Sequence, residues 1–193
     1  MKKLYLIIPS ILILGWLLIA CATPPIDDMN RAQDAVIRAE NDANAVNYAS
    51  PTLLQARDAL ARMQAEADAR RYDAARNLAA EAIRHAERAI SEGRDGAARA
   101  REEAESVIRE LGGLMSETTN AINAARRVPN TQLNFDAISR EMDVARRAYD
   151  EIQQSFEASR YRDVISRGQI IRSMLSDINS RITGTIRGIS LKQ

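Results

Sequence analysis

The sequence predicts an all-α protein of about five helices, arranged as elongated antiparallel hairpins in a coiled-coil-like bundle. Apolar residues recur at alternating spacings of three and four from Met29 to Ile182, and this rhythm lines one face of an α-helix. Alanine fills many of these positions, so neighbouring helices can approach closely. Pro51 and Pro129 mark helix boundaries, because helical geometry is disfavoured just before a proline.

The N-terminal residues have the pattern of a secretory signal. Two lysines precede an apolar run over residues 4–19, and the hydrophobicity stops before Pro24 and Pro25. The run is short for a membrane-spanning helix, which needs about 20 apolar residues, and Pro9 interrupts it. A cleaved signal is therefore favoured over an uncleaved anchor. The signal ends on a pattern that resembles the lipobox of bacterial lipoproteins: Leu18, Ile19, Ala20 and Cys21.

The lipobox resemblance implies a lipid anchor and a location. It implies that residues 1–20 are removed as a signal peptide and that Cys21 receives a diacylglycerol and a further acyl chain such as palmitate. Three acyl chains, two from the diacylglycerol and one on the amino group, anchor a protein stably to a membrane. Ala22, rather than aspartate, follows the cysteine, which favours the outer membrane with the protein facing the periplasm. Residues 21–26 then serve as a short tether.

The charged residues argue against a nucleic-acid partner. Removing residues 1–20 takes away two lysines and no acid, so the formal net charge changes from +1 to −1. Arginines alternate with acids along the chain, which is typical of solvated helix faces, whereas nucleic acid requires clustered positive charge. With the single cysteine acylated, no disulfide can form, so stability must come from packing.

Two helices are predicted in the first third of the exported chain. The first runs from Asp27 to about Asn47, since acidic residues suit a helix N-terminus. Its apolar stripe is Met29, Ala32, Val36, Ala39, Ala43 and Val46. The second begins near Pro51, because proline suits the first turn of a helix, and it ends at a turn over residues 70–73. Its stripe is Leu53, Ala56, Leu60, Met63 and Ala67.

A much longer apolar stripe follows, from Ala75 to Val128. One interpretation is a single helix over residues 73–127, roughly 80 Å long at a rise of about 1.5 Å per residue. The other is a break at Gly112-Gly113, because an interior glycine costs about 1 kcal/mol relative to alanine. The apolar phase is the same on both sides of the glycines, which favours one long helix.

The C-terminal part predicts a second hairpin. The fourth helix carries Phe135, Ile138, Met142, Ala145, Tyr149, Ile152 and Phe156. The fifth helix, which we expect to fray from Gly184, carries Val164, Gly168, Ile171, Leu175, Ile178 and Ile182. The turn between them repeats the earlier one, since Ala69-x-Arg71-Tyr72 matches Ala158-x-Arg160-Tyr161. This match predicts an internal repeat.

One set of residues carries a family resemblance: Ala35-Val36, Ala39, Tyr48-Ala49, Pro51, Leu53, Ala56, Leu60, Arg71-Tyr72-Asp73, Ala75, Leu78-Ala79, Ala82 and Ala86. With these residues, the segment 29–90 resembles DUF4398, a domain of unknown function found in bacterial lipoproteins. The resemblance implies a helical hairpin, an envelope location and no known catalytic residues. We therefore predict a signal peptide (1–20), a tether (21–26), a DUF4398-like hairpin region (27–111) and a second hairpin (112–193).

The sequence lacks the residue sets that catalysis needs. His85 is the only histidine, and Ala82 stands where a Glu-x-x-His carboxylate site would have its glutamate. No glycine-rich phosphate loop and no Gly-x-Ser-x-Gly elbow occurs in the chain. We expect no enzyme activity, cofactor, metal or small-molecule substrate.

These observations favour a lipid-anchored, non-enzymatic helical spacer or protein-interaction scaffold, whose partner is another protein or a second copy. The alternative is a tetratricopeptide-like binding module that grips a peptide or an envelope polymer such as peptidoglycan. Residues 160–193 hold seven basic groups and two acids, which suits either an anionic surface or the acidic first helix. The packing residues expected on the helix seams are Leu60, Met63, Ala82, Ala86, Ile138, Met142, Tyr149, Phe156, Ile171 and Leu175.

Overall fold

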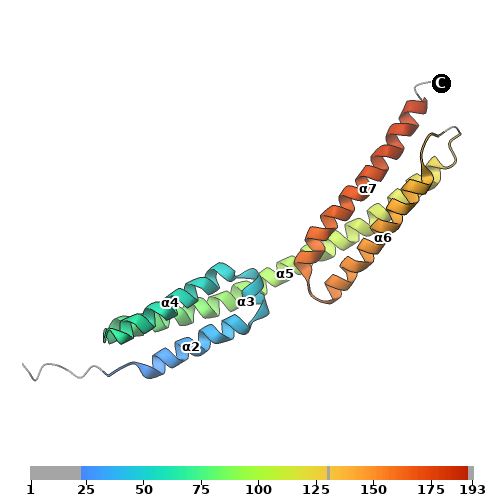
Figure 1. Ribbon diagram of the computed structural model, residues 1–193. Coiled ribbons are helices and arrows are strands. Elements are labelled where there is room, and N and C mark those ends of the chain that lie inside the picture. Colours follow the sequence, from blue (N-terminus) through green and yellow to red (C-terminus); the bar gives the residue numbers. More distant parts are fainter. Residues whose placement is uncertain (1–22, 130, 191–193) are drawn as a thin grey trace, which may run out of the picture. The chain divides into compact units, whose positions relative to one another are not determined.

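The computed structural model describes residues 23–129 and 131–190, and over these ranges the chain forms six α-helices and no strand. The predicted all-α class is therefore confirmed. The helices are α2 (Ile26–Asn41), α3 (Ala43–Tyr48), α4 (Ser50–Asp68), α5 (Tyr72–Ala125), α6 (Phe135–Glu157) and α7 (Tyr161–Ser190) (Figure 1).

The longest helix, α5, confirms the interpretation of one continuous helix. It contains 54 residues and passes through Gly112 and Gly113 without a break. Leu111 and Thr118, on either side of the two glycines, are fully buried, so the packed face continues across them. Gly112 also leaves room for a neighbouring ring, because a Cβ atom there would lie 3.2 Å from the hydroxyl oxygen of Tyr149.

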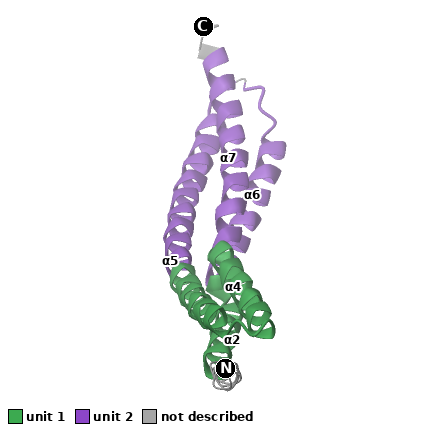
Figure 2. Ribbon diagram, turned by 90° about the vertical axis from the view of Figure 1, so that its left-hand side faces the viewer, with its two compact units in different colours: residues 1–94 green, residues 95–193 purple. Residues whose placement is uncertain are grey.

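Two compact units divide the chain between Arg94 and Asp95 (Figure 2). The first part of α5 belongs to unit 1 and the remainder belongs to unit 2. We had placed the boundary between the two hairpin regions at residues 111 and 112. The division between the compact units falls inside the continuous helix α5. The sequence has no proline at this point, and the chain forms no loop there.

Unit 1 consists of α2, α3, α4 and the first part of α5. Helices α2, α4 and the first part of α5 lie side by side, and the short helix α3 joins α2 to α4 at one end (Figure 1). Alanine dominates its buried cluster, and the largest fully buried side chains there are Met63 and Val36. Small side chains let helix backbones approach closely, so unit 1 gains its packing from short distances rather than from large apolar groups. The predicted alanine seam of this region is therefore an internal feature of the unit.

The predicted first helix, from Asp27 to Asn47, is wrong because the chain breaks at Asp42. Asp42 has an extended backbone, and its side chain accepts hydrogen bonds of 2.9 Å from the N–H groups of Asn44 and Ala45. This side-chain cap satisfies backbone donors at the start of α3 and stabilises a separate short helix. The break also shifts the apolar phase. Ala45 is buried, whereas Val46, which we had placed on the stripe, is exposed.

Unit 2 consists of the later part of α5 with α6 and α7, and its core contains larger residues. Isoleucine, leucine and methionine supply most of its buried cluster, and α6 and α7 form an extensive contact. The predicted fraying of the last helix from Gly184 is wrong, since α7 continues to Ser190. Ile182 is buried and Ile186 packs against the same cluster, so apolar contacts stabilise the last turns.

The two interhelical turns that the sequence pairs have the same backbone geometry. Arg70 and Ser159 adopt the left-handed conformation, with φ of 59° and 57°. In each turn this residue donates to the carbonyl three residues earlier, and the next residue donates to the carbonyl five residues earlier, all at 2.9 Å. This is the Schellman arrangement, which satisfies carbonyl groups at a helix C-terminus.

The buried positions of the helices on either side of the two turns also correspond. Buried residues in unit 1 have buried counterparts 89 positions later in unit 2, in many cases bulkier ones. Examples are Leu53 and Met142, Ala56 and Ala145, Met63 and Ile152, Ala75 and Val164, Ala82 and Ile171, and Ala86 and Leu175. The second hairpin thus repeats the pattern of the first with larger apolar side chains.

Candidate functional site

The predicted lipidation residue, Cys21, and the lipobox residues Leu18, Ile19 and Ala20 lie outside the described residues. The described chain begins with an irregular segment, Thr23 to Pro25, immediately before α2. The structure therefore leaves the lipid anchor as a sequence-based prediction.

The predicted packing residues all lie in the two apolar clusters. Unit 1 contains Leu60, Met63, Ala82 and Ala86. Unit 2 contains Ile138, Met142, Tyr149, Phe156, Ile171 and Leu175. Most of these side chains are buried, and Leu60, Tyr149 and Phe156 are partly buried against the clusters. Because the helices of each unit already cover these residues, any surface that binds a partner must lie elsewhere.

Polar contacts hold two of the aromatic residues of unit 2 in place. The Tyr149 hydroxyl donates to the carbonyl oxygen of Ile108 at 3.2 Å, so a largely apolar ring packs while its polar end is satisfied. The rings of Phe156 and Tyr161 lie 5.4 Å apart in a tilted arrangement beside the Ser159 turn. These contacts are structural, and none exposes a reactive group.

Residues with catalytic or metal-binding chemistry do not cluster within the part of the chain that the structure describes. No group of three His, Cys, Asp or Glu side chains there is placed to hold a metal ion. The imidazole Nε2 of His85 lies 3.6 Å from a carboxylate oxygen of Glu81, one turn earlier on the same helix, and its side chain is only 25% exposed. This contact is an ordinary helix-surface pair.

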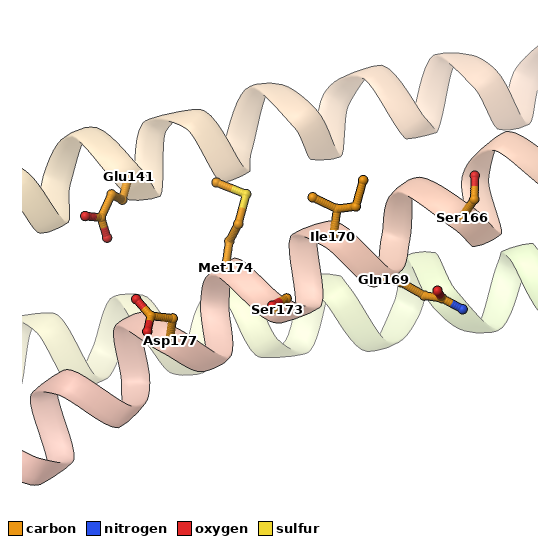
Figure 3. Close-up of a pocket in the computed structure, with 7 residues that line it drawn as sticks. All are labelled: Glu141, Ser166, Gln169, Ile170, Ser173, Met174 and Asp177. Carbon is orange, nitrogen blue, oxygen red and sulfur yellow. The ribbon is translucent and has the colours of Figure 1, made fainter.

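A groove of about 570 Å³ lies between α6 and α7 and forms the first candidate binding surface. We call it the α6–α7 groove. Ile170 and Met174 point from α7 toward α6 along it, and Glu141 and Asp177 lie at one end (Figure 3). Ile170 is 62% exposed, which is unusual for a large apolar side chain in this protein. The remaining lining residues are Ser166, Gln169 and Ser173.

A second groove, of about 640 Å³, lies between α5 and α7 and is more polar. Hydroxyl groups and an amide line it, with Arg172 and Glu110 among the charged residues. The Asn179 amide nitrogen donates to the Thr118 hydroxyl oxygen at 2.9 Å, whereas the buried Asn179 side-chain oxygen has no hydrogen-bond partner among the described residues. The other residues that line this groove between α5 and α7 are Leu114, Ser176, Ser180, Thr183, Gly184 and Arg187.

Ion pairs within unit 2 neutralise much of the basic character of α7. Arg172 donates two hydrogen bonds, of 2.9 and 2.6 Å, to the Glu110 carboxylate. These hydrogen bonds lower the pKa of Glu110 and raise the pKa of Arg172. Hydrogen bonding to Glu141 likewise raises the pKa of Arg181. Three arginines of α7, Arg167, Arg172 and Arg181, thus pair with acids of the same unit, and Arg160, just before the helix, pairs with Asp163.

The alanine-rich helices of unit 1 are the part of the chain that a known family covers. Residues 27–105 match DUF4398, a domain of unknown function. The predicted resemblance is confirmed. The DUF4398 match extends beyond the predicted segment, 29–90, at both ends. It includes α2 from Asp27 onward and all of α3 and α4, and it continues into the part of α5 that belongs to unit 2.

Both grooves lie C-terminal to the DUF4398 segment, since their lining residues begin at Glu110 and at Glu141. No curated protein and no solved structure matches the chain. Within residues 23–129 and 131–190, no helix combines the length and the apolar character needed to cross a bilayer.

Sequence reasoning missed the residues that line the α6–α7 groove. Ile170 and Met174 are four residues apart, so they share a helix face, but the buried stripe through Ile171 and Leu175 is the stronger signal. When a helix carries two apolar stripes, one packs in the core of its own unit and the second can line a groove at the surface. The second stripe was the available clue to this groove.

Proposed function

We propose that this protein is a lipid-anchored, non-enzymatic spacer or interaction scaffold of the bacterial cell envelope. The observation that carries the proposal is the sequence Leu18-Ile19-Ala20-Cys21, which follows a short apolar run and places the only cysteine at the end of a secretory signal. The resemblance to a lipobox supports the lipid anchor, and Ala22 after the cysteine favours the outer membrane, with the protein facing the periplasm.

Two features of the described chain support a role as a spacer or interaction scaffold. The first is the continuous helix α5, because a helix of 54 residues extends by about 1.5 Å for each residue. The second is the distribution of side chains, since alternating charges solvate the helix surfaces and the apolar seams are internal. Such a chain is suited to contacts with other proteins rather than to binding a reacting substrate.

The anchor is tested by metabolic labelling with a fatty acid and mass spectrometry of the N-terminal peptide. We expect the wild-type protein to carry acyl chains on Cys21, and Cys21→Ser to lose the label and leave the membrane fraction. Ala22→Asp is the matched control, because it retains Cys21 and should keep the label while changing the membrane that holds the protein. Wild-type protein with a free Cys21 thiol and no acyl chain contradicts the proposal.

A second candidate function is a module that binds peptidoglycan or a peptide, and the groove between α5 and α7 favours it. This groove presents several hydroxyl groups together with Arg172 and Arg187, which suits a polar polymer. Binding to isolated sacculi tests it. We expect Arg172→Gln/Arg187→Gln to reduce retention, with the distant Arg62→Gln as control. Equal retention of both variants and the wild type rules out this use of the groove.

A further inference from the structure

The side of α7 that borders the α6–α7 groove carries a second stripe, in which Met174 packs, partly buried, against the core of unit 2 and the other members lie outside the buried cluster. Its members are spaced alternately by four and three residues, the rhythm that keeps side chains on one face of two supercoiled helices. We call this set the outer stripe of α7: Asp163, Arg167, Ile170, Met174, Asp177 and Arg181. Three of its residues, Ile170, Met174 and Asp177, line the α6–α7 groove (Figure 3).

The outer stripe is complementary to itself when a second copy of it runs in the opposite direction. Residues equally far from position 172 then face one another. Asp163 faces Arg181 and Arg167 faces Asp177, so acids meet bases on both sides of the centre. At the centre, the two apolar residues Ile170 and Met174 face each other. A parallel arrangement would instead place each charge opposite an identical charge.

We propose that α7 is the docking surface for a second copy of this chain, with the two α7 helices packed antiparallel about position 172. The occupant follows from charge complementarity, because the outer stripe supplies an opposite charge for each of its own charges. The inference rests on the proposed scaffold function, because it names one partner of that scaffold. A monomeric chain could still be lipid-anchored and bind a different protein.

The charges of the outer stripe are available for such a contact. Asp177 already pairs with Arg181 at 3.1 Å, and Asp163 lies 3.9 Å from Arg160. Arg167 and Arg181 also pair with Glu151 and Glu141 of α6. All of these pairs are solvent-exposed and therefore weak, so the side chains can turn toward a partner at little cost. Docking would also remove Ile170 from water, which supplies a hydrophobic contribution.

The experiment uses two charge-reversal variants of the full chain, purified in mild detergent and studied by sedimentation equilibrium. In Asp177→Arg, both copies present arginine at positions 167 and 177; in Arg167→Asp, both present aspartate there. Each variant should self-associate about tenfold more weakly than the wild type, since two attractive contacts become repulsive. An equimolar mixture should recover wild-type association, because every contact in the mixed dimer is again between opposite charges.

Matched controls separate the surface from general damage. Asp150→Arg and Arg147→Asp, on the exposed side of α6, should leave self-association unchanged. Ile170→Lys should weaken it, whereas Leu54→Lys, at a 58% exposed position of unit 1, should not. Circular dichroism should show wild-type helix content for every variant.

The result that supports the proposal is weak association of each reversal variant alone and strong association of the mixture. A monomeric wild-type protein overturns it. So do reversal variants that associate as the wild type does, or a mixture that stays dissociated. Each of these outcomes leaves the acylation of Cys21 as a separate measurement, so failure of the dimer and failure of the envelope anchor are distinguishable.

Discussion

Gly93 of α5 lets the backbone of α3 approach it directly, because a Cβ atom at Gly93 would lie 2.5 Å from the backbone nitrogen of Ala45. The neighbouring atom belongs to the main chain, so it cannot move away as a flexible side chain could. We expect Gly93→Ala to lower the free energy of unfolding by about 1–3 kcal/mol, the usual range for overpacking. Urea denaturation followed by circular dichroism measures this change.

Gly113 provides the control for that prediction. It lies in the same helix, it is exposed, and apart from its own stretch of helix no described atom comes within 4 Å of the position that its Cβ would take. Gly113→Ala should therefore raise the free energy of unfolding by about 0.5–1 kcal/mol through helix propensity alone. Equal stabilisation by Gly93→Ala and Gly113→Ala would show that α3 does not pack closely on α5.

The sequence predicts the buried stripes well where the apolar rhythm is unbroken. Ile138, Met142 and Ile152 on α6 are examples, because each follows from period alone and each is buried. The break at Asp42 could not be predicted in the same way, since Ala43 and Val46 continue the rhythm in the sequence although Ala45 carries the packing. A local side-chain cap decided the structure there.

The second stripe of α7 is a sequence clue to the α6–α7 groove, but the shapes of the two grooves could not be predicted, for a different physical reason. The space between two helices depends on the lengths of side chains that come from both, and no single periodicity records it. Arg172 and Glu110, for example, are 62 residues apart, and their pairing depends on how α5 and α7 pack. The proposed lipid anchor is the opposite case, because the pattern that predicts it is entirely local to residues 18–21.

The left-handed conformation of Arg70 leads to a second prediction. A residue with a Cβ atom pays about 1–2 kcal/mol in this conformation, whereas glycine adopts it freely. The larger entropy of glycine in the unfolded chain offsets part of the gain. We expect Arg70→Gly to raise the free energy of unfolding by about 0.5–1 kcal/mol, measured by chemical denaturation. Arg62→Gly, inside α4, should instead lose about 1 kcal/mol, and a similar loss for both variants contradicts the turn geometry.

The Glu110–Arg172 pair leads to a third prediction, on pH. Hydrogen bonds from Arg172 hold the pKa of Glu110 below its ordinary value of 4.5, so the folded state binds this proton less readily than the unfolded state. The stabilisation is therefore present above about pH 4.5 and is lost as the pH falls through the lowered pKa. Melting temperatures at pH 6 and pH 3 test it. Glu110→Gln should reduce the difference between them, and Glu117→Gln, outside this pair, should not.

The buried contact between Thr118 and Asn179 leads to a fourth prediction. Thr118 is fully buried, donates to the carbonyl oxygen of Leu114 at 2.8 Å and accepts from the Asn179 amide at 2.9 Å. Thr118→Val keeps the shape of the side chain but leaves that amide without its acceptor. Because an unsatisfied buried polar group costs about 1–3 kcal/mol, the variant should lose stability in this range.

The double variant decides whether that loss comes from the unpaired amide. In Thr118→Val/Asn179→Leu both polar partners are gone, and so is the Asn179 oxygen, which has no hydrogen-bond partner within the part of the chain that the structure describes. Replacing both partners by apolar groups of similar shape is close to neutral, so we expect the double variant to be at least as stable as Thr118→Val. A double-mutant cycle from urea denaturation gives the coupling energy. Losses that simply add would mean that the two side chains do not interact in the folded protein.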